Sequence, residues 1–234
     1  YSNEPLTLNF HRTDHKDGSA TYLREFLRQY MMAKRPARTD YPSWNYVQFV
    51  ADSIAWDSDP LYGWCNKNFK KDGSPYNVYS DGLKVFTTID SRMQRYAEEA
   101  VYQHVARYFQ PAFDKENKPK PSSPFSDKLT PKQIRAILNR SITQSERWRT
   151  MKAAGYTPGE INQAFRQKIE MTVFTYHGDI DTLMSPLDSI RYYKEFLRSG
   201  FMSMDPKTGA VKAYVGGLDY PHFMYDMVSL GRRQ

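Results

Sequence analysis

Aromatic and aliphatic residues recur at helical spacing near the start of the chain. Within 21–33 aromatic residues recur every four positions, at Tyr22, Phe26 and Tyr30. Leu23 and Leu27 follow the first two of them. This period predicts an amphipathic helix, interrupted by Pro36. The segment 83–90 concentrates β-branched residues instead and predicts a strand.

A long helix is predicted after that strand. Asp90 or Ser91 caps it, and Pro111 ends it after about Phe109. Its expected apolar face comprises Met93, Tyr96, Ala97, Ala100, Val101, His104, Val105 and Tyr108. On such a face, His104 is a core or edge residue rather than a ligand. The prolines and lysines of 111–128 predict a linker-like stretch.

Three helices are expected next. Thr130 caps the first, with Pro131 at the first helical position, and the second covers about 143–154 and stops at Gly155. Thr157-Pro158-Gly159-Glu160 has the pattern of a capping box and opens the third.

The residues that follow predict one strand and one more helix. The strand covers 171–176, and His177-Gly178-Asp179 turns the chain. Ser185-Pro186-Leu187-Asp188 then caps a helix to about Arg198, which Gly200 terminates.

The stretch 201–234 begins with a predicted buried β-hairpin. Its arms are rich in strand formers, and Asp205-Pro206-Lys207-Thr208-Gly209 between them has the residue types of a turn. Gly216-Gly217 breaks the second strand. On these residues alone, an ordinary surface hairpin is an open alternative.

The segment 40–80 is aromatic and is expected to be irregular. Its aromatic residues either stack on sugars or bases or, as we favour, form a small core. They are Trp44, Tyr46, Phe49, Trp56, Tyr62, Trp64, Phe69, Tyr76 and Tyr79.

Composition and charge restrict the class of protein. The 234 residues are 40% hydrophobic and 25% charged, which is typical of a globular chain. The net charge is +7, but Lys and Arg are scattered, which favours a solvated basic surface over a nucleic-acid face. Weak attraction to anionic lipid or cell-wall polymer is equally compatible. No apolar run is long enough to span a membrane.

No metal or cofactor site is predicted. The single cysteine, Cys65, excludes an intrachain disulfide and is expected to be buried beside Trp64. His11, Asp14, His15 and Asp17 match no strong metal-site spacing and predict a solvated loop. Because no initiator Met or signal peptide is present, we expect the chain to be an excised or processed piece.

Several segments resemble the class A (bifunctional) penicillin-binding proteins, most closely those of Bacteroidetes-type bacteria. The segment 83–100 (LKVFTTIDSRMQRYAEEA) resembles the opening of their transpeptidase domain. The segments 182–193 and 201–234 resemble the stretch just before its nucleophile. Residues 7–10 and 20–29 resemble the connection that leaves the glycosyltransferase domain. The similarity is weakest over 111–169.

This resemblance implies an α+β fold, namely a partial transpeptidase fold. It would contain the first strand and helix, a helical insertion and the hairpin of the central sheet, after an aromatic-rich linker. The implied divisions are a linker region at 1–80, the transpeptidase start at 81–110, the insertion at 111–169, and further transpeptidase domain at 170–234.

The resemblance implies a peptidoglycan synthase, with glycosyltransferase and D,D-transpeptidase activity, but no catalytic residue in this chain. The family acylates a Ser in a Ser-x-x-Lys motif, which is absent here, and we expect the chain to end just before it. Lys207-Thr208-Gly209 and Ser43-Trp44-Asn45 spell the companion motifs at the wrong places. The Glu-Asp pair of the glycosyltransferase is absent too, and Asp179 and Asp181 are expected to be turn and capping residues.

The implied partners are peptidoglycan and its lipid-linked precursor, on the periplasmic side of the inner membrane; β-lactams would bind only the full transpeptidase domain. No nucleic-acid partner is expected. The alternative is a non-catalytic module that binds glycan or nucleic acid through the aromatic region 40–80. Because the predicted strands would have open edges, we expect the isolated chain to fold incompletely or to associate.

Overall fold

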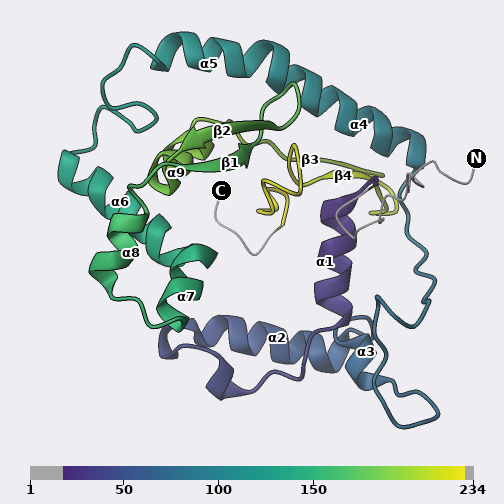
Figure 1. Ribbon diagram of the computed structural model, residues 1–234. Coiled ribbons are helices and arrows are strands. Elements are labelled where there is room, and N and C mark those ends of the chain that lie inside the picture. Colours follow the sequence, from purple (N-terminus) through teal and green to yellow (C-terminus); the bar gives the residue numbers. More distant parts are fainter. Residues whose placement is uncertain (1–17, 230–234) are drawn as a thin grey trace, which may run out of the picture. The chain divides into compact units, whose positions relative to one another are not determined.

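The computed structural model describes residues 18–229 and contains both helices and strands (Figure 1). Two antiparallel sheets of two strands each accompany the helices, so the expected α+β class is confirmed. The chain forms two compact units. Unit 1 combines the residues up to Glu98 with those from Gly200 onward, and unit 2 is Glu99–Ser199.

Unit 1 begins with the predicted amphipathic helix, α1 (Thr21–Met31). Its buried residues differ in part from the expected stripe, because Tyr22 is buried whereas Phe26 is exposed. Glu25 takes a buried position because its carboxylate accepts hydrogen bonds from Arg28 and from the Tyr79 hydroxyl. Paired polar groups can therefore occupy positions that an apolar pattern assigns to hydrophobic residues.

The aromatic segment is more regular than expected. It contains the 3-10 helices η1 (Arg38–Asp40) and η2 (Ser43–Asn45) and the α-helices α2 (Tyr46–Ser58) and α3 (Trp64–Lys67). The residues of α2 include neither Gly nor Pro, so nothing in them breaks a helix. Some rings pack in pairs, such as Tyr41 with Phe49 and Trp64 with Tyr76, but Trp44 is 81% exposed.

The strand predicted at 83–90 is wrong. This segment is extended but forms no ladder, and Phe86 is 91% exposed. Only two hydrogen bonds join it to the hairpin: the Thr88 hydroxyl donates to the carbonyl of Val211, and the Asp90 N–H donates to that of Lys212. Two bonds at its end are too few to make a strand, whatever its β propensity.

The long helix after Asp90 is confirmed at its start and continues beyond the predicted end. Asp90 caps α4 (Ser91–His104) by accepting from the N–H groups of Arg92 and Met93. The helix then passes through a π-helical segment, η3 (Val105–Phe109), into α5 (Gln110–Asn117). Pro111 lies within this continuous helix, just after the π-helical segment, and because it has no N–H to donate, one bond of the backbone ladder is missing there.

The apolar face predicted for this helix is largely wrong. Val105 is buried as expected, but Met93, Tyr96 and Tyr108 are exposed, and His104 is exposed beside the rings of Tyr108 and Phe109. Met93 and Tyr96 lie before the π-helical segment; there the buried position belongs to Gln94, whose side chain bonds the backbone of Tyr214. The π-helical segment widens one turn and shifts only the residues in it and after it around the axis.

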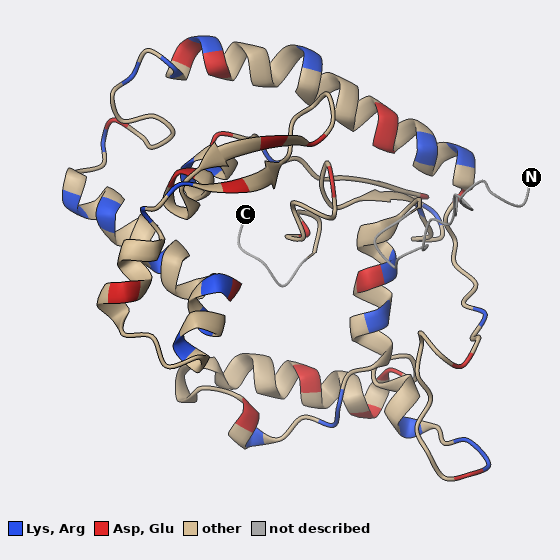
Figure 2. Ribbon diagram, viewed as in Figure 1, with Lys and Arg blue, Asp and Glu red and all other residues tan. Residues whose placement is uncertain are grey.

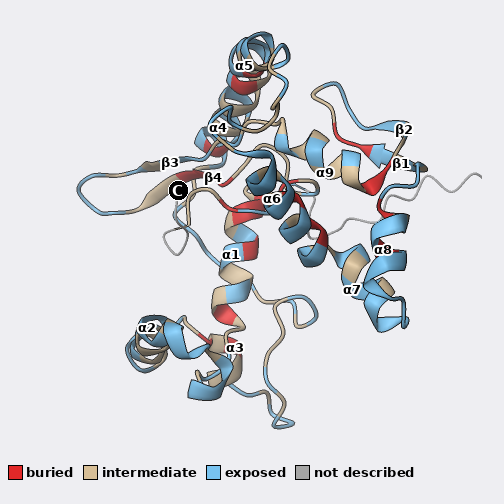
Figure 3. Cartoon of the chain, turned by 90° about the vertical axis from the view of Figure 1, so that its left-hand side faces the viewer, coloured by how far each residue is buried: buried red, intermediate tan, exposed pale blue. Residues whose placement is uncertain are grey.

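The hairpin consists of β3 (Phe201–Met204) and β4 (Val211–Val215), with a register irregularity between Ser203 and Met204. Its turn forms as expected: the Asp205 carboxylate accepts from two backbone N–H groups, and Gly209 has a φ of 72°. The expected burial holds for only one arm, because the end of β4 is buried whereas β3 is largely exposed (Figure 3).

Unit 2 contains three helices near the predicted positions. They are α6 (Pro131–Gln144), α7 (Glu146–Ala153) and α8 (Pro158–Ala164). Thr130 and Thr157 each form a complete capping box. The predicted start of α7 was three residues early, because the Ser145 hydroxyl caps this helix. The core is formed by Ile142, Ile161 and Phe165.

Two strands and a helix complete unit 2. β1 (Ile169–Val173) pairs with β2 (Ile180–Met184), and α9 (Pro186–Lys194) starts at the predicted Ser185 cap. β2 was not predicted, because its residues alternate little in polarity. Asp181 is therefore a strand residue, and its carboxylate accepts a 2.6 Å bond from the Thr172 hydroxyl across the sheet.

Charged residues are distributed over most elements of both units. Figure 2 shows Lys and Arg interspersed with Asp and Glu along the helices. This arrangement agrees with a solvated basic surface and not with a single cationic face.

Candidate functional site

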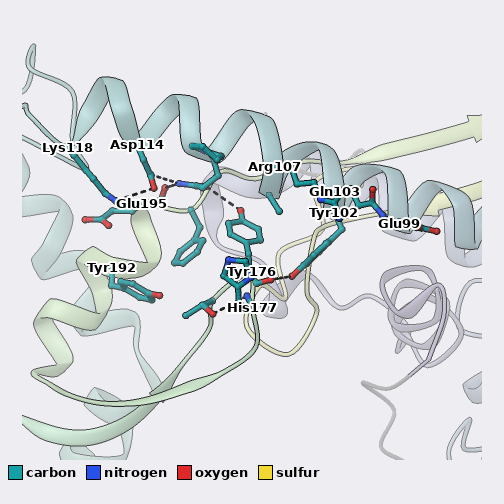
Figure 4. Close-up of a pocket in the computed structure, with 15 residues that line it drawn as sticks. Glu99, Tyr102, Gln103, Arg107, Asp114, Lys118, Tyr176, His177, Tyr192 and Glu195 are labelled. Carbon is teal, nitrogen blue, oxygen red and sulfur yellow. Dashed lines mark hydrogen bonds and ion pairs between the residues drawn. The ribbon is translucent and has the colours of Figure 1, made fainter.

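Unit 2 contains a cleft of about 680 Å³ (Figure 4). The helix that runs from α4 through η3 to α5 supplies one wall; the turn at 175–177 and α9 supply the rest. Its lining includes Glu99, Tyr102, Gln103, Arg107, Gln110, Asp114, Lys118, Tyr176, His177, Tyr192, Glu195 and Phe196.

Gln110 organises the wall of the cleft. Its side-chain oxygen accepts from the Leu197 N–H at 3.0 Å and the Tyr176 hydroxyl at 3.3 Å. Its amide nitrogen donates to Asp114 at 2.8 Å and to the backbone carbonyl of Glu195 at 3.0 Å. This buried amide thereby joins α5 to both other walls and fixes the separation between them.

The π-helical segment η3 forms part of the same wall and contributes Ala106 and Arg107 to the lining. Single π turns within α-helices occur frequently at functional sites, because they re-aim side chains at a cost in helix stability. The Arg107 side chain is exposed, and no ion pair joins it to another described residue.

Aromatic rings form the floor. Tyr176 contacts Phe174 and Phe196, with ring centroids 5.4 and 5.6 Å apart, and Tyr192 lies 5.1 Å from Phe196. The Tyr192 hydroxyl donates a 2.6 Å bond to the carbonyl of Phe174, and the Tyr102 hydroxyl donates to that of Tyr176 at 2.8 Å. The floor is thus a fixed apolar surface with hydroxyl groups at its edge.

Burial changes the acidity of two lining groups. It raises the pKa of Tyr176 to about 12, with a smaller contribution from Tyr102. Burial also raises the pKa of the Glu195 carboxyl; the negative charge of Asp114 adds to this effect and the positive charge of Lys118 opposes it. Lys118 lies 3.5 Å from Asp114.

The lining suits binding better than covalent chemistry. It contains no Ser or Cys, and its one aliphatic hydroxyl, on Thr175, donates a 2.6 Å bond to the carbonyl of Gly178. Acceptors, donors and aromatic faces are present, but no nucleophile is paired with a base. The arrangement can hold a small polar molecule against an apolar floor.

The motif-like residues singled out in the sequence lie elsewhere. Lys207-Thr208-Gly209 occupies the turn of the hairpin, where Asp205 binds the N–H groups of the first two. Ser43-Trp44-Asn45 forms η2 and is exposed except for an intermediate Asn45. Asp179 directly precedes β2 and Asp181 lies within it; neither residue lines the cleft. The structure therefore brings none of them into this cleft.

The remaining candidates give no metal site. Cys65 is buried as predicted and is 1% exposed, and burial raises the pKa of its thiol. His11, Asp14, His15 and Asp17 lie outside the described residues. Within 18–229, no three His, Cys, Asp or Glu side chains come together in a group that could hold a metal ion.

The cleft itself was missed in the sequence analysis. Its key residues, Gln110, Tyr176 and Glu195, are far apart in the chain and match no motif. The one available signal was the density of aromatic residues at Phe174, Tyr176, Tyr192, Tyr193 and Phe196.

Two comparisons with known proteins give a match to this chain. Residues 120–197 match the family model of the penicillin-binding protein middle domain. Penicillin-binding protein 1A of Rickettsia bellii is 27% identical over 178 residues, which cover 69% of this chain and 22% of the relative. The chain thus spans about a fifth of that protein's length. No solved structure matches the chain significantly.

None of the helices described between residues 18 and 229 is both long and apolar enough to cross a bilayer. The family-model match lies within unit 2, which contains the cleft. The relative extends the similarity over most of the chain. Together, the two matches support the assignment of this chain as part of a penicillin-binding protein.

Proposed function

We propose that the chain is part of a class A, bifunctional peptidoglycan synthase and contributes scaffold rather than reacting side chains. The parent protein would join glycan strands and cross-link their peptides in bacterial cell-wall assembly. The proposal includes the partial transpeptidase fold and the divisions 1–80, 81–110, 111–169 and 170–234.

One observation carries this proposal. The resemblance is most specific over 83–100 and 182–234, and Asp90 and Gln94 of the first segment bond to the hairpin of the second within unit 1. The Gln94 side chain accepts from the N–H of Tyr214 at 2.7 Å and donates to its carbonyl at 2.8 Å. The Asp90 N–H donates to the carbonyl of Lys212. Segments more than a hundred residues apart thus assemble together, as the start of one domain would.

The absence of a reacting residue is part of the proposal. Ser-x-x-Lys does not occur in the sequence, and Lys207 lies in a turn whose geometry is set by Asp205 and Gly209. A serine nucleophile also needs an adjacent base and an oxyanion hole. We place these groups in another part of the parent protein, on the periplasmic side of the inner membrane, where lipid-linked precursor and peptidoglycan would bind.

A fluorescent penicillin tests the proposal. The 234-residue chain and the full-length protein encoded by its gene are incubated with the probe and separated under denaturing conditions. We expect a labelled band for the full-length protein and none for the chain. A labelled chain would overturn the assignment of no catalytic residue, and an unlabelled full-length protein would overturn the transpeptidase assignment.

The alternative, a binding module based on 40–80, has less support. Exposed Trp44 and Phe69 provide ring faces, but neither comparison points to such a module. Salt-sensitive retention of the chain on single-stranded DNA, without retention on peptidoglycan, would favour a nucleic-acid module.

A further inference from the structure

The cleft in unit 2 contains two charged groups that the protein leaves unpaired. No hydrogen bond or ion pair joins the Arg107 guanidinium or the Glu195 carboxyl to another described residue. Glu195 is partly buried, where a carboxyl without a partner is unfavourable. Such a pair of groups, facing one cleft, is expected where a ligand completes the bonding.

The two groups lie toward different ends of the cleft. Glu195 is next to Asp114 and Lys118, whereas Arg107 lies farther along the helix (Figure 4). Arg107 precedes Asp114 by seven residues, which corresponds to roughly 10 Å along a helix axis. Because Gln110 fixes the wall between them, this separation is a property of the folded cleft.

The charges restrict the ligand. Three carboxylates (Glu99, Asp114 and Glu195) face two permanent cations (Arg107 and Lys118), and Lys118 is already paired with Asp114. A polyphosphate or nucleic-acid backbone would meet net repulsion. A ligand with one carboxylate would meet much less repulsion, which a charge-assisted hydrogen bond to Arg107 can offset.

The floor favours a sugar ring. The half-buried rings of Tyr176, Tyr192 and Phe196 form an apolar surface, with Glu195 and the Tyr192 hydroxyl at its margin. A pyranose has an apolar C–H face and a rim of hydroxyl groups, which match the rings and the polar margin.

We propose that this cleft is a non-catalytic binding site for a short saccharide that carries one carboxylate. The carboxylate binds Arg107, the ring stacks on the aromatic floor, and Glu195 bonds hydroxyl groups. The choice of a cell-wall saccharide rests on the proposed function. In that setting, the site would hold a glycan strand whose stem peptides have been removed, because the muramic acid carboxylate is free only there.

The test is an isothermal calorimetric titration of the full-length protein encoded by the gene, because the isolated chain is expected to fold incompletely or to associate. The probe is the disaccharide of N-acetylglucosamine and N-acetylmuramic acid, which carries one carboxylate; the neutral disaccharide of two N-acetylglucosamines and the peptide alone serve as comparisons. We expect the acidic disaccharide to bind most tightly, and the variants below to assign this binding to the cleft.

Variants assign the binding groups. Arg107→Ala changes an exposed side chain and should weaken acidic-disaccharide binding about tenfold or more, the loss expected for one charge-assisted hydrogen bond. The same substitution should not change the binding of the neutral disaccharide, which binds more weakly. Glu195→Gln should weaken both. Arg149→Ala, on an exposed position of α7 outside the cleft, is the matched control and should change neither.

Three results would overturn the inference: no saccharide binding, binding of the peptide alone, or binding that Arg107→Ala does not change. None of these depends on penicillin labelling of the full-length protein. A labelled protein whose cleft binds no saccharide therefore contradicts this inference and leaves the proposed function in place.

Discussion

Units 1 and 2 differ in what fills their interiors. Unit 2 has an apolar core at Ile142, Ile161 and Phe165, against which Trp148, Met151, Leu187 and Ile190 pack. Unit 1 also buries apolar residues, but it adds polar side chains that bond inside it: Gln94 bonds the backbone of β4, and the Tyr214 hydroxyl donates to Asp226 at 2.6 Å. An apolar core tolerates small shifts, whereas polar anchors require exact partners. The following substitutions test this difference.

Phe165→Ala should have the largest effect. Phe165 is 2% exposed in the core of unit 2, so its truncation leaves a cavity and should cost about 3–5 kcal/mol of unfolding free energy. Urea denaturation measures the loss. Phe69→Ala, at a ring that is 60% exposed in unit 1, is the control and should change stability by less than about 0.5 kcal/mol. If both variants lost the same unfolding free energy, the apolar core would not be what stabilises unit 2.

Gln94→Met should destabilise unit 1 by about 1–3 kcal/mol, although the side chains are similar in size. The substitution leaves both backbone groups of Tyr214 without their partner in a buried place. Amide hydrogen exchange at Tyr214 reports the local change. Gln103→Met removes a bond from Gln103 to Glu99 on an exposed surface, and a similar loss for this control would contradict the anchoring role of Gln94.

Gly217→Ala and Gly159→Ala should have opposite signs. A Cβ on Gly217 would overlap the Tyr22 ring and hydroxyl, which are held by a 2.6 Å bond to the carbonyl of Phe223, so we expect a loss of about 1–3 kcal/mol. A Cβ on Gly159, in α8, meets only the Thr157 hydroxyl at 3.9 Å. There, helix propensity predicts a gain of about 0.5–1 kcal/mol. Thermal unfolding distinguishes the two, and a stabilised Gly217→Ala variant would refute the close packing.

Glu195→Gln should give the smallest effect, and one that depends on pH. Because the folded state raises the pKa of this carboxyl, ionisation above that pKa weakens folding. The variant should therefore be more stable than the parent at pH 7, by less than about 1 kcal/mol since the group is partly solvated. The gain should vanish below the unfolded pKa of about 4.3, where both side chains are neutral. Thermal unfolding of the variant and the parent at pH 7 and below about pH 4.3 measures this difference in stability. A difference that is the same at both pH values would show that ionisation of Glu195 is not its cause.

Local signals explain the parts of the fold that were predicted. The caps at Asp90, Thr130, Thr157 and Ser185 depend on residues within three positions, and all four form. The turn at Asp205 likewise depends on its own side chain and on a glycine with positive φ. Such features are fixed by nearest neighbours, so one sequence suffices to predict them.

The wrong predictions concern segments whose structure depends on residues far away in the sequence. The segment 83–90 has strand propensity but obtains only two bonds from its neighbour, and β2 forms through pairing with β1. Burial of Gln94 depends on β4, more than a hundred residues away. The candidate cleft depends in the same way on Gln110, which joins α5 to α9 and to Tyr176. Propensity and periodicity contain no information on these partners.

The sequence by itself determined the capped helix starts after Asp90, Thr130, Thr157 and Ser185, the hairpin turn and the resemblance to penicillin-binding proteins, because each depends on residues close together in the chain. The tertiary structure alone decided which faces are buried, where the long helix takes a π turn, and that Arg107, Tyr176 and Glu195 share one cleft. The physical reason is that burial and hydrogen bonding are satisfied between segments, and a partner distant in sequence becomes near only after folding.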